Sequence, residues 1–451
     1  LYAPIFADGT DDYAPGKVIN AGNSWAEFVS ATVQRYMPGG DLAQAQGWPE
    51  GVGIRHWEIW NEPDLDQFWN GTVEEFYRLL EVGYKAAKAV DPECTIVLGG
   101  LAIYEKPDWF PQFLDLIPSP EEAYFDVLGY HYYWSIYDGE YHMVRLRDLL
   151  DAHGLTHIPI WMTESGVSVW DDYPGPRNDP NSPYRGTMVE QAAYVIQNAA
   201  LARYHGLERV FHFMLHDDCG NGCTDADGDG DCDENDPPGD AFGLRQNFGQ
   251  TSCFPAQGRK RPSYTAYQVV AREFRDLTPL WRQKSWNQDR VAFARREAGE
   301  RVLVLWATQG VTATAVIPAI TDTARLLWVE PFLIDTGYTG ITRTATITAV
   351  NGYYTITLPP ATNQNSLEHA QGQPEDRYFI GGPPYIVIEE DGLPPTSSVD
   401  PLPPISPPTF TVTWHGSDSI AGIESYDLWY ACLLYTSDAA DEGLGVDLGG
   451  R

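Results

Sequence analysis

Apolar and polar residues follow two different spacings along the chain. Up to about residue 275, short apolar runs of strand length are separated by longer segments whose apolar residues recur every three or four positions, the spacing of one helical face. The runs are Tyr2–Phe6, Ile54–Trp60, Thr95–Gly100, Tyr124–His131, Ile158–Glu164 and Arg209–His216. Repeated strand–helix units of this kind predict an α/β fold with a parallel sheet.

Helix starts are marked by a hydroxyl residue followed three positions later by Glu. This spacing lets each side chain satisfy a backbone N–H group of the first helical turn. It occurs at Ser24–Glu27, Thr72–Glu75 and Thr187–Glu190. We therefore expect capped helices at these three places, the first ending at Met37, and a last helix over Arg261–Arg275.

From about Asn287 to Glu390 the spacing changes to period two, in runs separated by Gly, Pro and Asn turns. The runs include Arg301–Ala307, Arg325–Val329, Ile341–Ala349 and Tyr353–Leu358. This pattern is typical of an all-β sandwich. Seven prolines between Pro394 and Pro408 then predict a stiff linker. The alternating residues Phe410, Val412 and Trp414 resemble the start of a fibronectin-type or immunoglobulin-like module.

The predicted domains are an α/β domain over 1–280, a β-sandwich over 281–392, and a linker with a shortened β module over 393–431. Residues 432–451 show no strand or helix pattern and resemble translated sequencing adapter, so we exclude them from the fold. The chain starts at Leu1 without a signal peptide, and we expect its natural start to lie upstream.

Composition narrows the classes of partner. The chain has 29 basic and 63 acidic side chains, a net charge of −34. Binding to nucleic acid needs a basic surface, so this charge argues against a nucleic-acid partner. No apolar run is long enough for a membrane-spanning helix. Aromatic residues make up 13% of the chain and either fill the cores or form flat platforms for sugars.

Two glutamates stand at the ends of predicted strands. Glu62 follows the strand 54–60 in Trp60-Asn61-Glu62-Pro63, and Glu164 ends the strand 158–164. In folds of repeated strand–helix units the chemistry sits at these carboxyl ends, so both side chains can face one cleft. Glycoside hydrolysis needs such a pair: one acid protonates the leaving oxygen, and the other attacks the sugar or activates water.

With these motifs, residues 1 to about 275 resemble the clan A glycoside hydrolases, retaining enzymes on a (β/α)8 TIM barrel. In that clan an Asn-Glu pair closing strand 4 carries the acid/base, and a Glu closing strand 7 is the nucleophile. Strand 54–60 counts as strand 4 and strand 158–164 as strand 7. The resemblance implies that Glu62 is the acid/base and Glu164 the nucleophile. Residues 57–72 are most similar to the β-xylosidase and α-L-iduronidase family.

The same count places Tyr2–Phe6 at strand 3. The expected fold is therefore a TIM barrel that lacks about its first two strands, with strands 3 to 8 in an open, curved sheet. The basic residue that the clan has near the nucleophile would be missing with them.

The resemblance also implies substrate-binding residues. Asn61 would bind the sugar 2-hydroxyl, and His131-Tyr132-Tyr133 resembles the His-x-Tyr of the clan, in which the tyrosine hydrogen-bonds the nucleophile. The usual Trp of strand 8 is absent, and His212 or His216 stands in its place. Candidate walls of the cleft are Trp60, Trp69, Trp134, Trp161 and Trp170.

An acidic segment after the last predicted barrel strand matches the spacing of a calcium loop. Oxygen ligands are expected at positions 1, 3, 5, 7, 9 and 12 of twelve residues, with Gly at position 6. Those positions hold Asp225, Asp227, Asp229, Asp231, Asp233 and Asp236, with Gly230 at the sixth. The sequence predicts a structural calcium site; the alternative is an acidic surface loop without an ion.

Four cysteines surround this segment, namely Cys219, Cys223, Cys232 and Cys253. They allow three disulfide pairings, and disulfides are typical of a secreted protein. Zinc is an alternative, although carboxylates favour calcium. Cys94 is expected to be a buried free thiol.

The sequence therefore predicts a secreted or cell-surface retaining glycoside hydrolase, β-xylosidase-like, with a carbohydrate substrate and no catalytic cofactor. One alternative function is a non-catalytic carbohydrate-binding or adhesion protein, which would keep the cleft but would not cleave the glycosidic bond. A transglycosylase would use the same two glutamates.

Overall fold

The structure, a computed structural model, describes residues 19, 22–172, 185–217, 241–246, 258–295, 298–334, 337–362, 378–390, 396–401 and 409–417. The predicted strand Tyr2–Phe6 lies outside these residues. The acidic segment 225–236, the four cysteines around it and residues 432–451 also lie outside them.

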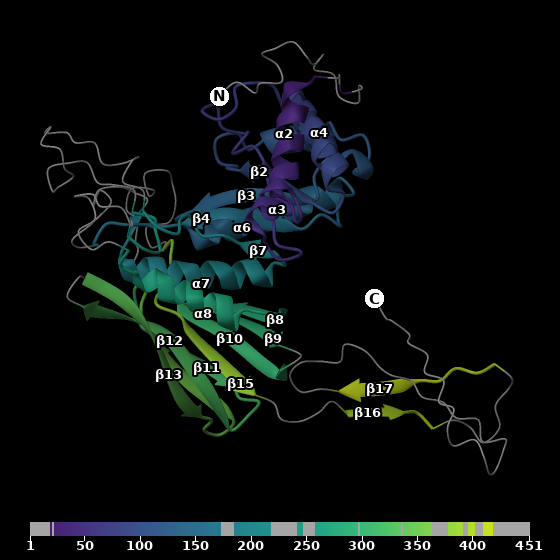
Figure 1. The fold of residues 1–451 in the computed structure, drawn as a ribbon. Coiled ribbons are helices and arrows are strands. Elements are labelled where there is room, and N and C mark those ends of the chain that lie inside the picture. The colour runs from purple at the N-terminus through teal and green to yellow at the C-terminus, as the bar shows by residue number, and fades with distance from the viewer. Residues whose placement is uncertain are drawn as a thin grey trace, which may run out of the picture.

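The first part of the chain forms a five-stranded parallel sheet in the order β1-β2-β3-β4-β7. Figure 1 shows β2, β3, β4 and β7 on one side of α7. Its strands are β1 (His56–Ile59), β2 (Thr95–Leu101), β3 (Val127–Tyr133), β4 (Ile160–Gly166) and β7 (Arg209–Val210). They overlap the predicted strands, although β3 and β4 begin two or three residues later and end two residues later than expected, and β7 stops well short of His216. Among the described residues the sheet is open, with β1 and β7 at its edges.

Helices pack on this sheet because alternate strand residues face them. Ile96 and Leu98 join the core beneath the helices, whereas Val97 points to the opposite face and meets Val127 and Trp161. The helices are α2 (Ser24–Tyr36), α3 (Asp41–Gln46), α4 (Val73–Val90), α5 (Trp109–Asp115), the 3-10 turn η1 (Pro120–Glu122), α6 (Ile136–Ala152) and α7 (Met188–Tyr204). A two-stranded parallel pair, β5 (Ser168–Val169) and β6 (Arg185–Gly186), precedes α7.

Two of the three predicted helix caps are confirmed. Thr72 and Glu75 form a capping box at α4, and Thr187 and Glu190 form another at α7. The prediction at Ser24 was wrong: Asn23 caps α2 by accepting a hydrogen bond from the backbone N–H of Ala26. The Asn23 side chain satisfies the first-turn donor, so the helix begins at Ser24 itself.

The chain continues as two antiparallel layers. A six-stranded sheet contains β8 (Leu277–Lys284), β9 (Gln288–Arg295), β10 (Glu300–Ala307), β12 (Thr323–Ile334), β13 (Gly337–Thr348) and β15 (Tyr385–Glu390). A two-stranded sheet of β11 (Ala313–Pro318) and β14 (Tyr353–Leu358) packs on it through alternate buried residues. The strand β8 runs across residues 280 and 281, where we placed the boundary between the first two domains.

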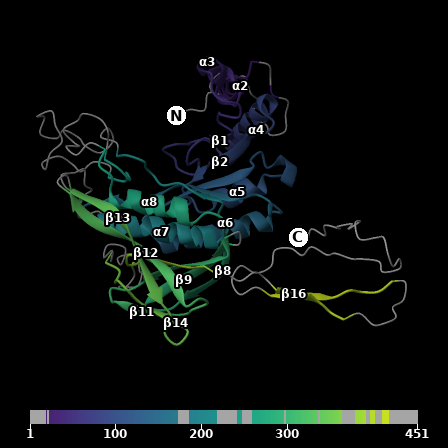
Figure 2. The same cartoon turned by 60° about the horizontal axis from the view of Figure 1, so that its bottom comes forward.

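The helices α7 and α8 (Pro262–Glu273) lie between the parallel and the antiparallel sheets, as Figure 2 shows from a second side. Their apolar residues share one core with the six-stranded sheet. Gln197 on α7 also bonds the backbone N–H of Gly381 and the carbonyl of Gly382. One helix thus ties the sheet that carries the candidate glutamates to the β layers.

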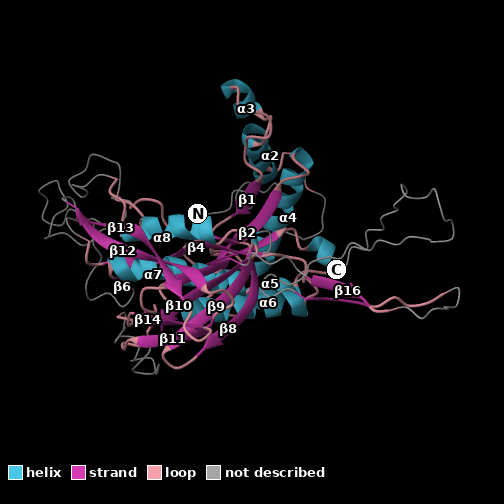
Figure 3. Cartoon of the chain, turned by 90° about the horizontal axis from the view of Figure 1, so that it is seen from below, coloured by secondary structure: helices cyan, strands magenta, loops and turns pink. Residues whose placement is uncertain are grey.

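A separate antiparallel pair, β16 (Thr396–Val399) and β17 (Trp414–Ser417), stands apart from these layers in Figures 1 and 3. The fibronectin- or immunoglobulin-like identity of this region stays a prediction. In the described part of the chain, no helix is both long and apolar enough to cross a membrane.

Candidate active site

Glu62 is held at the carboxyl end of β1 by a tight loop over β2. Its backbone N–H donates to the carbonyl of Gly100 at 3.1 Å, and its own carbonyl accepts from the N–H of Leu65 at 3.0 Å. Trp60 and Glu62 have φ angles of 72° and 43°, in the left-handed region that costs energy for residues with a side chain. Such conformations persist only where the surrounding contacts enforce them.

Asp64 supplies one of those contacts. Its carboxylate is 1% exposed and accepts hydrogen bonds from the backbone N–H groups of Ala102 at 3.0 Å and Ile103 at 2.6 Å. Ile103 also has a positive φ of 59°. The two bonds fasten the loop that carries Glu62 to the end of β2. Sequence reasoning missed this residue, although Asp64 stands directly after the Asn-Glu-Pro motif.

Glu164 lies within β4, one strand beyond β3, and the predicted tyrosine contact is present. The hydroxyl of Tyr133 donates to Oε2 of Glu164. Burial, reinforced by the negative charge of Glu164, raises the pKa of the Tyr133 hydroxyl. The phenol therefore stays protonated and acts as a hydrogen-bond donor.

His131 lies between the two carboxylates. Its Nδ1 is 2.8 Å from Oε1 of Glu62 and 3.5 Å from Oε2 of Glu164. The ring is 2% exposed, while the side chains of Glu62 and Glu164 are 13% and 28% exposed. One donor atom from each of the three residues lies within 4.8 Å of the others. The predicted residues therefore converge, and a divalent cation could also be held by this donor set.

Gly100 makes room for His131. A Cβ atom at this position would lie 1.9 Å from Nε2 of His131, so a larger residue would displace the ring. Below the pair, Oε1 of Glu58 accepts from the N–H of Gly100 at 2.7 Å and from the hydroxyl of Thr163 at 2.9 Å. Glu58 thereby links β1, β2 and β4 directly beneath the two glutamates. Sequence reasoning did not identify either residue.

The predicted aromatic residues occupy different positions. Trp69 and Trp161 are 3% and 4% exposed and belong to cores, so the structure does not bring these two to a cleft surface. Trp60 is half-buried and donates from Nε1 to the carbonyl of Phe68. Trp134 is half-buried beside Tyr133, with ring centres 5.5 Å apart. Trp170 is 37% exposed.

The remaining candidates are Asn61, His212 and His216. Asn61, which precedes Glu62 in the sequence, is half-buried. His212 bonds the carbonyl of Phe242 through Nε2 at 3.0 Å, and burial lowers its pKa to about 4. His216 is exposed. Cys94 is a buried free thiol, as predicted.

The sequence profile of glycosyl hydrolases family 39 matches residues 14–201. The matched part of the chain, which is less than half of it, is similar to that family. The match includes both converging glutamates, His131 and Tyr133, so the resemblance inferred from the motifs is confirmed at the level of the glycoside hydrolase family.

Two curated relatives are β-xylosidases. The chain is 32% identical over 94 residues to a β-xylosidase of Geobacillus stearothermophilus, which is 20% of this chain and 17% of that protein. It is 26% identical over 256 residues to a β-xylosidase of Caldicellulosiruptor saccharolyticus, which is 50% of this chain and 45% of that protein. The chain thus spans less than half the length of these relatives.

Solved structures show the same fold at low sequence identity. An α-L-arabinofuranosidase from Thermotoga maritima, in a complex with arabinose, aligns with a TM-score of 0.52 and 13% identity over 82% of this chain and 74% of that chain. This likeness supports the arrangement of a parallel α/β domain followed by antiparallel sheets.

Proposed function

We propose that the family 39 region is the catalytic domain of a retaining glycosidase that acts on β-xylosides. The observation that carries the proposal is the convergence of Glu62 and Glu164, with one carboxylate oxygen of each within 4.8 Å of the other. Retaining enzymes hold their two carboxyl groups about 5 to 5.5 Å apart, whereas inverting enzymes leave about 6.5 to 9.5 Å for a water molecule. The xyloside specificity rests on the two β-xylosidases to which the chain is similar.

The environments of the two glutamates support different roles. Glu164 is the more exposed, and the hydroxyl of Tyr133 donates to its Oε2, which fixes the orientation expected of a nucleophile. Glu62 is the more buried and lies 2.8 Å from Nδ1 of His131, a second group able to exchange a proton with it. This contact suits an acid/base that must give up and take back a proton in each cycle.

In the first step, Glu62 protonates the glycosidic oxygen while a carboxylate oxygen of Glu164 attacks the anomeric carbon. The bond to the leaving group breaks, and a glycosyl ester forms on Glu164. In the second step, Glu62 removes a proton from water, which attacks the same carbon and releases the sugar with its original configuration. Asn61 would bind the 2-hydroxyl group of the sugar.

Four further parts of the proposal start from the sequence. The segment Asp225–Asp236 holds a structural calcium ion, cysteines near it form disulfides, and the protein is secreted or displayed on the cell surface. The alternating β pattern of 281–392 makes that region a sandwich domain beside the catalytic domain.

Hydrolysis of aryl glycosides followed by proton NMR tests the proposal on the protein as its gene encodes it. We expect the β-xyloside to be cleaved, with the β-anomer of xylose appearing first and the α-anomer only by mutarotation. An initial α-anomer would contradict retention. Binding without cleavage would point to a carbohydrate-binding protein, and transfer of the sugar to an added alcohol without hydrolysis would point to a transglycosylase.

A further inference from the structure

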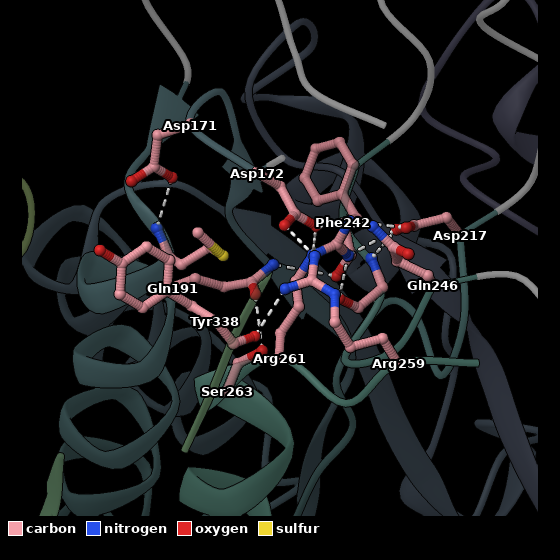
Figure 4. A network of polar contacts seen from close by, with 12 residues as sticks. Asp171, Asp172, Gln191, Asp217, Phe242, Gln246, Arg259, Arg261, Ser263 and Tyr338 are labelled. Carbon is pink, nitrogen blue, oxygen red and sulfur yellow. Dashed lines mark hydrogen bonds and ion pairs between the residues drawn. The ribbon is translucent and has the colours of Figure 1, made fainter. Parts of the chain in front are cut away.

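A buried ion network lies behind the candidate site, outside the groups that carry the chemistry. Arg261, which precedes α8, donates from Nε to Asp172 at 2.7 Å and from Nη2 to Asp217 at 2.6 Å. Arg259 donates to Asp172 as well. Figure 4 shows Arg261 between the two aspartates. Asp172, Asp217 and Arg261 are all fully buried.

Burying two carboxylates and a guanidinium group removes their hydration, and the ion pairs often do no more than compensate for that loss. Stability alone is therefore a weak reason for such a network. A better-supported use of buried polar groups is to specify one local geometry.

The network fixes the described segment 241–246. The N–H of Gly243 donates to Oδ1 of Asp217 at 2.8 Å, and Nη1 of Arg261 donates to the carbonyl of Gly243 at 2.5 Å. Gln246 donates to Asp172 at 3.3 Å. A Cβ atom at residue 243 would lie 2.4 Å from the backbone nitrogen of Asp217. Only glycine permits this close approach, so the backbone next to Phe242 has little freedom.

Phe242 is held from its other side too. Its carbonyl accepts from Nε2 of His212 at 3.0 Å and from the amide of Gln191 at 3.2 Å. Its ring meets the ring of Tyr133 edge to face, with centres 5.5 Å apart and planes at 77°. Phe213 meets both rings at 6.0 Å. Tyr133 is therefore enclosed by two phenylalanine rings while its hydroxyl reaches Glu164.

Gly166 completes the enclosure. It lies two residues after Glu164 on β4, and a Cβ atom there would be 2.4 Å from the carbonyl oxygen of Phe213 and 3.2 Å from Cδ1 of Phe242. The absence of a side chain lets both phenylalanines approach the strand that carries Glu164. The aromatic contacts around Tyr133 thus depend on residues from β4, from the segment after β7 and from the Arg261 network.

We propose that Phe242, fixed by the buried Asp172–Arg261–Asp217 network, is a positioning residue that holds the Tyr133 hydroxyl on Glu164. The inference rests on the proposed function, in which Glu164 is the nucleophile. In this proposal Phe242 acts through the Tyr133 ring and takes no part in the chemical steps. It prevents the Tyr133 ring from tilting into the space that Phe242 occupies, and so preserves the hydrogen bond from the Tyr133 hydroxyl to Glu164.

Carbon-13 NMR of protein labelled at Cζ of tyrosine tests this directly and needs no turnover. The Cζ resonance reports the hydrogen bond of the phenol, and Tyr133→Phe assigns it among 26 tyrosines. Glu164→Gln gives the displacement expected when the charged acceptor is removed. We expect Phe242→Leu, which keeps apolar bulk and loses the ring, to shift the Tyr133 resonance in the same direction by at least half of that displacement. We expect Arg261→Lys to shift it in the same direction as well, since lysine cannot hold both aspartates.

The matched control is Arg282→Lys. Arg282 also pairs with two acidic residues, Glu140 and Asp289, but at the junction of α6 with β8 and β9. This control should leave the Tyr133 resonance in place. Phe242→Leu in the Glu164→Gln background should add no further shift, because the same hydrogen bond is already weakened.

A Tyr133 resonance that stays in place in folded Phe242→Leu and Arg261→Lys proteins would overturn the inference. Additive shifts in the double variant would also overturn it. Failure of the proposed function is a separate result: it is seen as absence of glycoside cleavage by the parent protein, whatever the NMR shifts show.

Discussion

Nδ1 of His131 lies 2.8 Å from Oε1 of Glu62, and the same nitrogen is 3.5 Å from the nearer oxygen of Glu164. The two glutamates come from loops and strands about 100 residues apart in the sequence, yet one buried ring touches the first and adjoins the second. Because His131 contacts Glu62 and lies next to Glu164, we expect a change of charge on one carboxylate to act on the other through this ring.

Replacing His131 should impair the acid step more than the attack. His131→Asn removes the partner of Glu62, so we expect kcat/KM to fall about 100-fold for substrates whose leaving group needs protonation. Aryl glycosides with acidic phenols should lose much less. Gly100→Ala should reproduce the pattern, because the added Cβ atom would lie 1.9 Å from Nε2 of His131. Equal losses on both kinds of substrate would contradict this role.

Asp64 should be required for the stability of the loop that carries Glu62. Asp64→Asn keeps the shape but presents an NH₂ group to one of the two backbone N–H donors, at Ala102 or Ile103. An unsatisfied buried group costs about 1 to 3 kcal/mol, which urea unfolding would measure. Asp66→Asn is the matched control, since Asp66 pairs with Lys106 at the surface and should change stability by less than about 1 kcal/mol. Similar losses in both variants would contradict the assignment.

His142 should make the stability depend on pH. Burial lowers its pKa from 6.5 to about 4, and its ring contacts that of Tyr132, with centres 5.0 Å apart and planes tilted by 38°. Below pH 6.5 the unfolded chain takes up a proton that the folded protein refuses until about pH 4. The free energy of unfolding therefore falls as the pH falls through this window.

His142→Phe keeps the aromatic contact and removes the titration. Between pH 7 and pH 4.5, the free energy of unfolding measured in urea should fall in the variant by on the order of 2 kcal/mol less than in the parent. The exposed His157, changed to Asn, serves as the control and should follow the parent curve. A His142→Phe curve parallel to the parent would show that this histidine does not set the pH response.

The acidic segment predicts a response to chelation. An ion that binds only the folded protein stabilises it by mass action, so excess EDTA should lower the melting temperature and added calcium should restore it. Asp229→Asn should weaken the restoration, whereas magnesium at the same concentration should not replace calcium. A melting curve unchanged by EDTA would remove the calcium assignment.

Local patterns predicted the elements and the two glutamates because their causes are local. The Thr72 and Thr187 capping boxes depend on residues three positions apart, and the strand runs depend on burial of successive side chains. Glu62 and Glu164 could be paired from their places at strand ends, since parallel strands bring those ends together.

The features that sequence reasoning missed depend on contacts between distant segments. Gly100 matters only because His131 comes from the next strand, and Phe242 matters only because Arg261 and Asp217 fix its backbone. Trp161 was predicted at the cleft from its place beside Glu164, but alternation along β4 directs it to the buried cluster with Val97 and Val127. The error at Ser24 arose because Asn23, one residue earlier, is the cap and accepts from the N–H of Ala26.

The central claim is that Glu164 is the nucleophile and Glu62 the acid/base of a retaining glycosidase. Its most direct test is covalent labelling with an activated 2-deoxy-2-fluoro-xyloside, followed by mass spectrometry of the intact protein and its peptides. We predict one label per chain, on Glu164, in the parent and in Glu62→Gln, because the activated leaving group needs no protonation, and no label in Glu164→Gln. A label on another residue, or undiminished labelling of Glu164→Gln, would contradict the account.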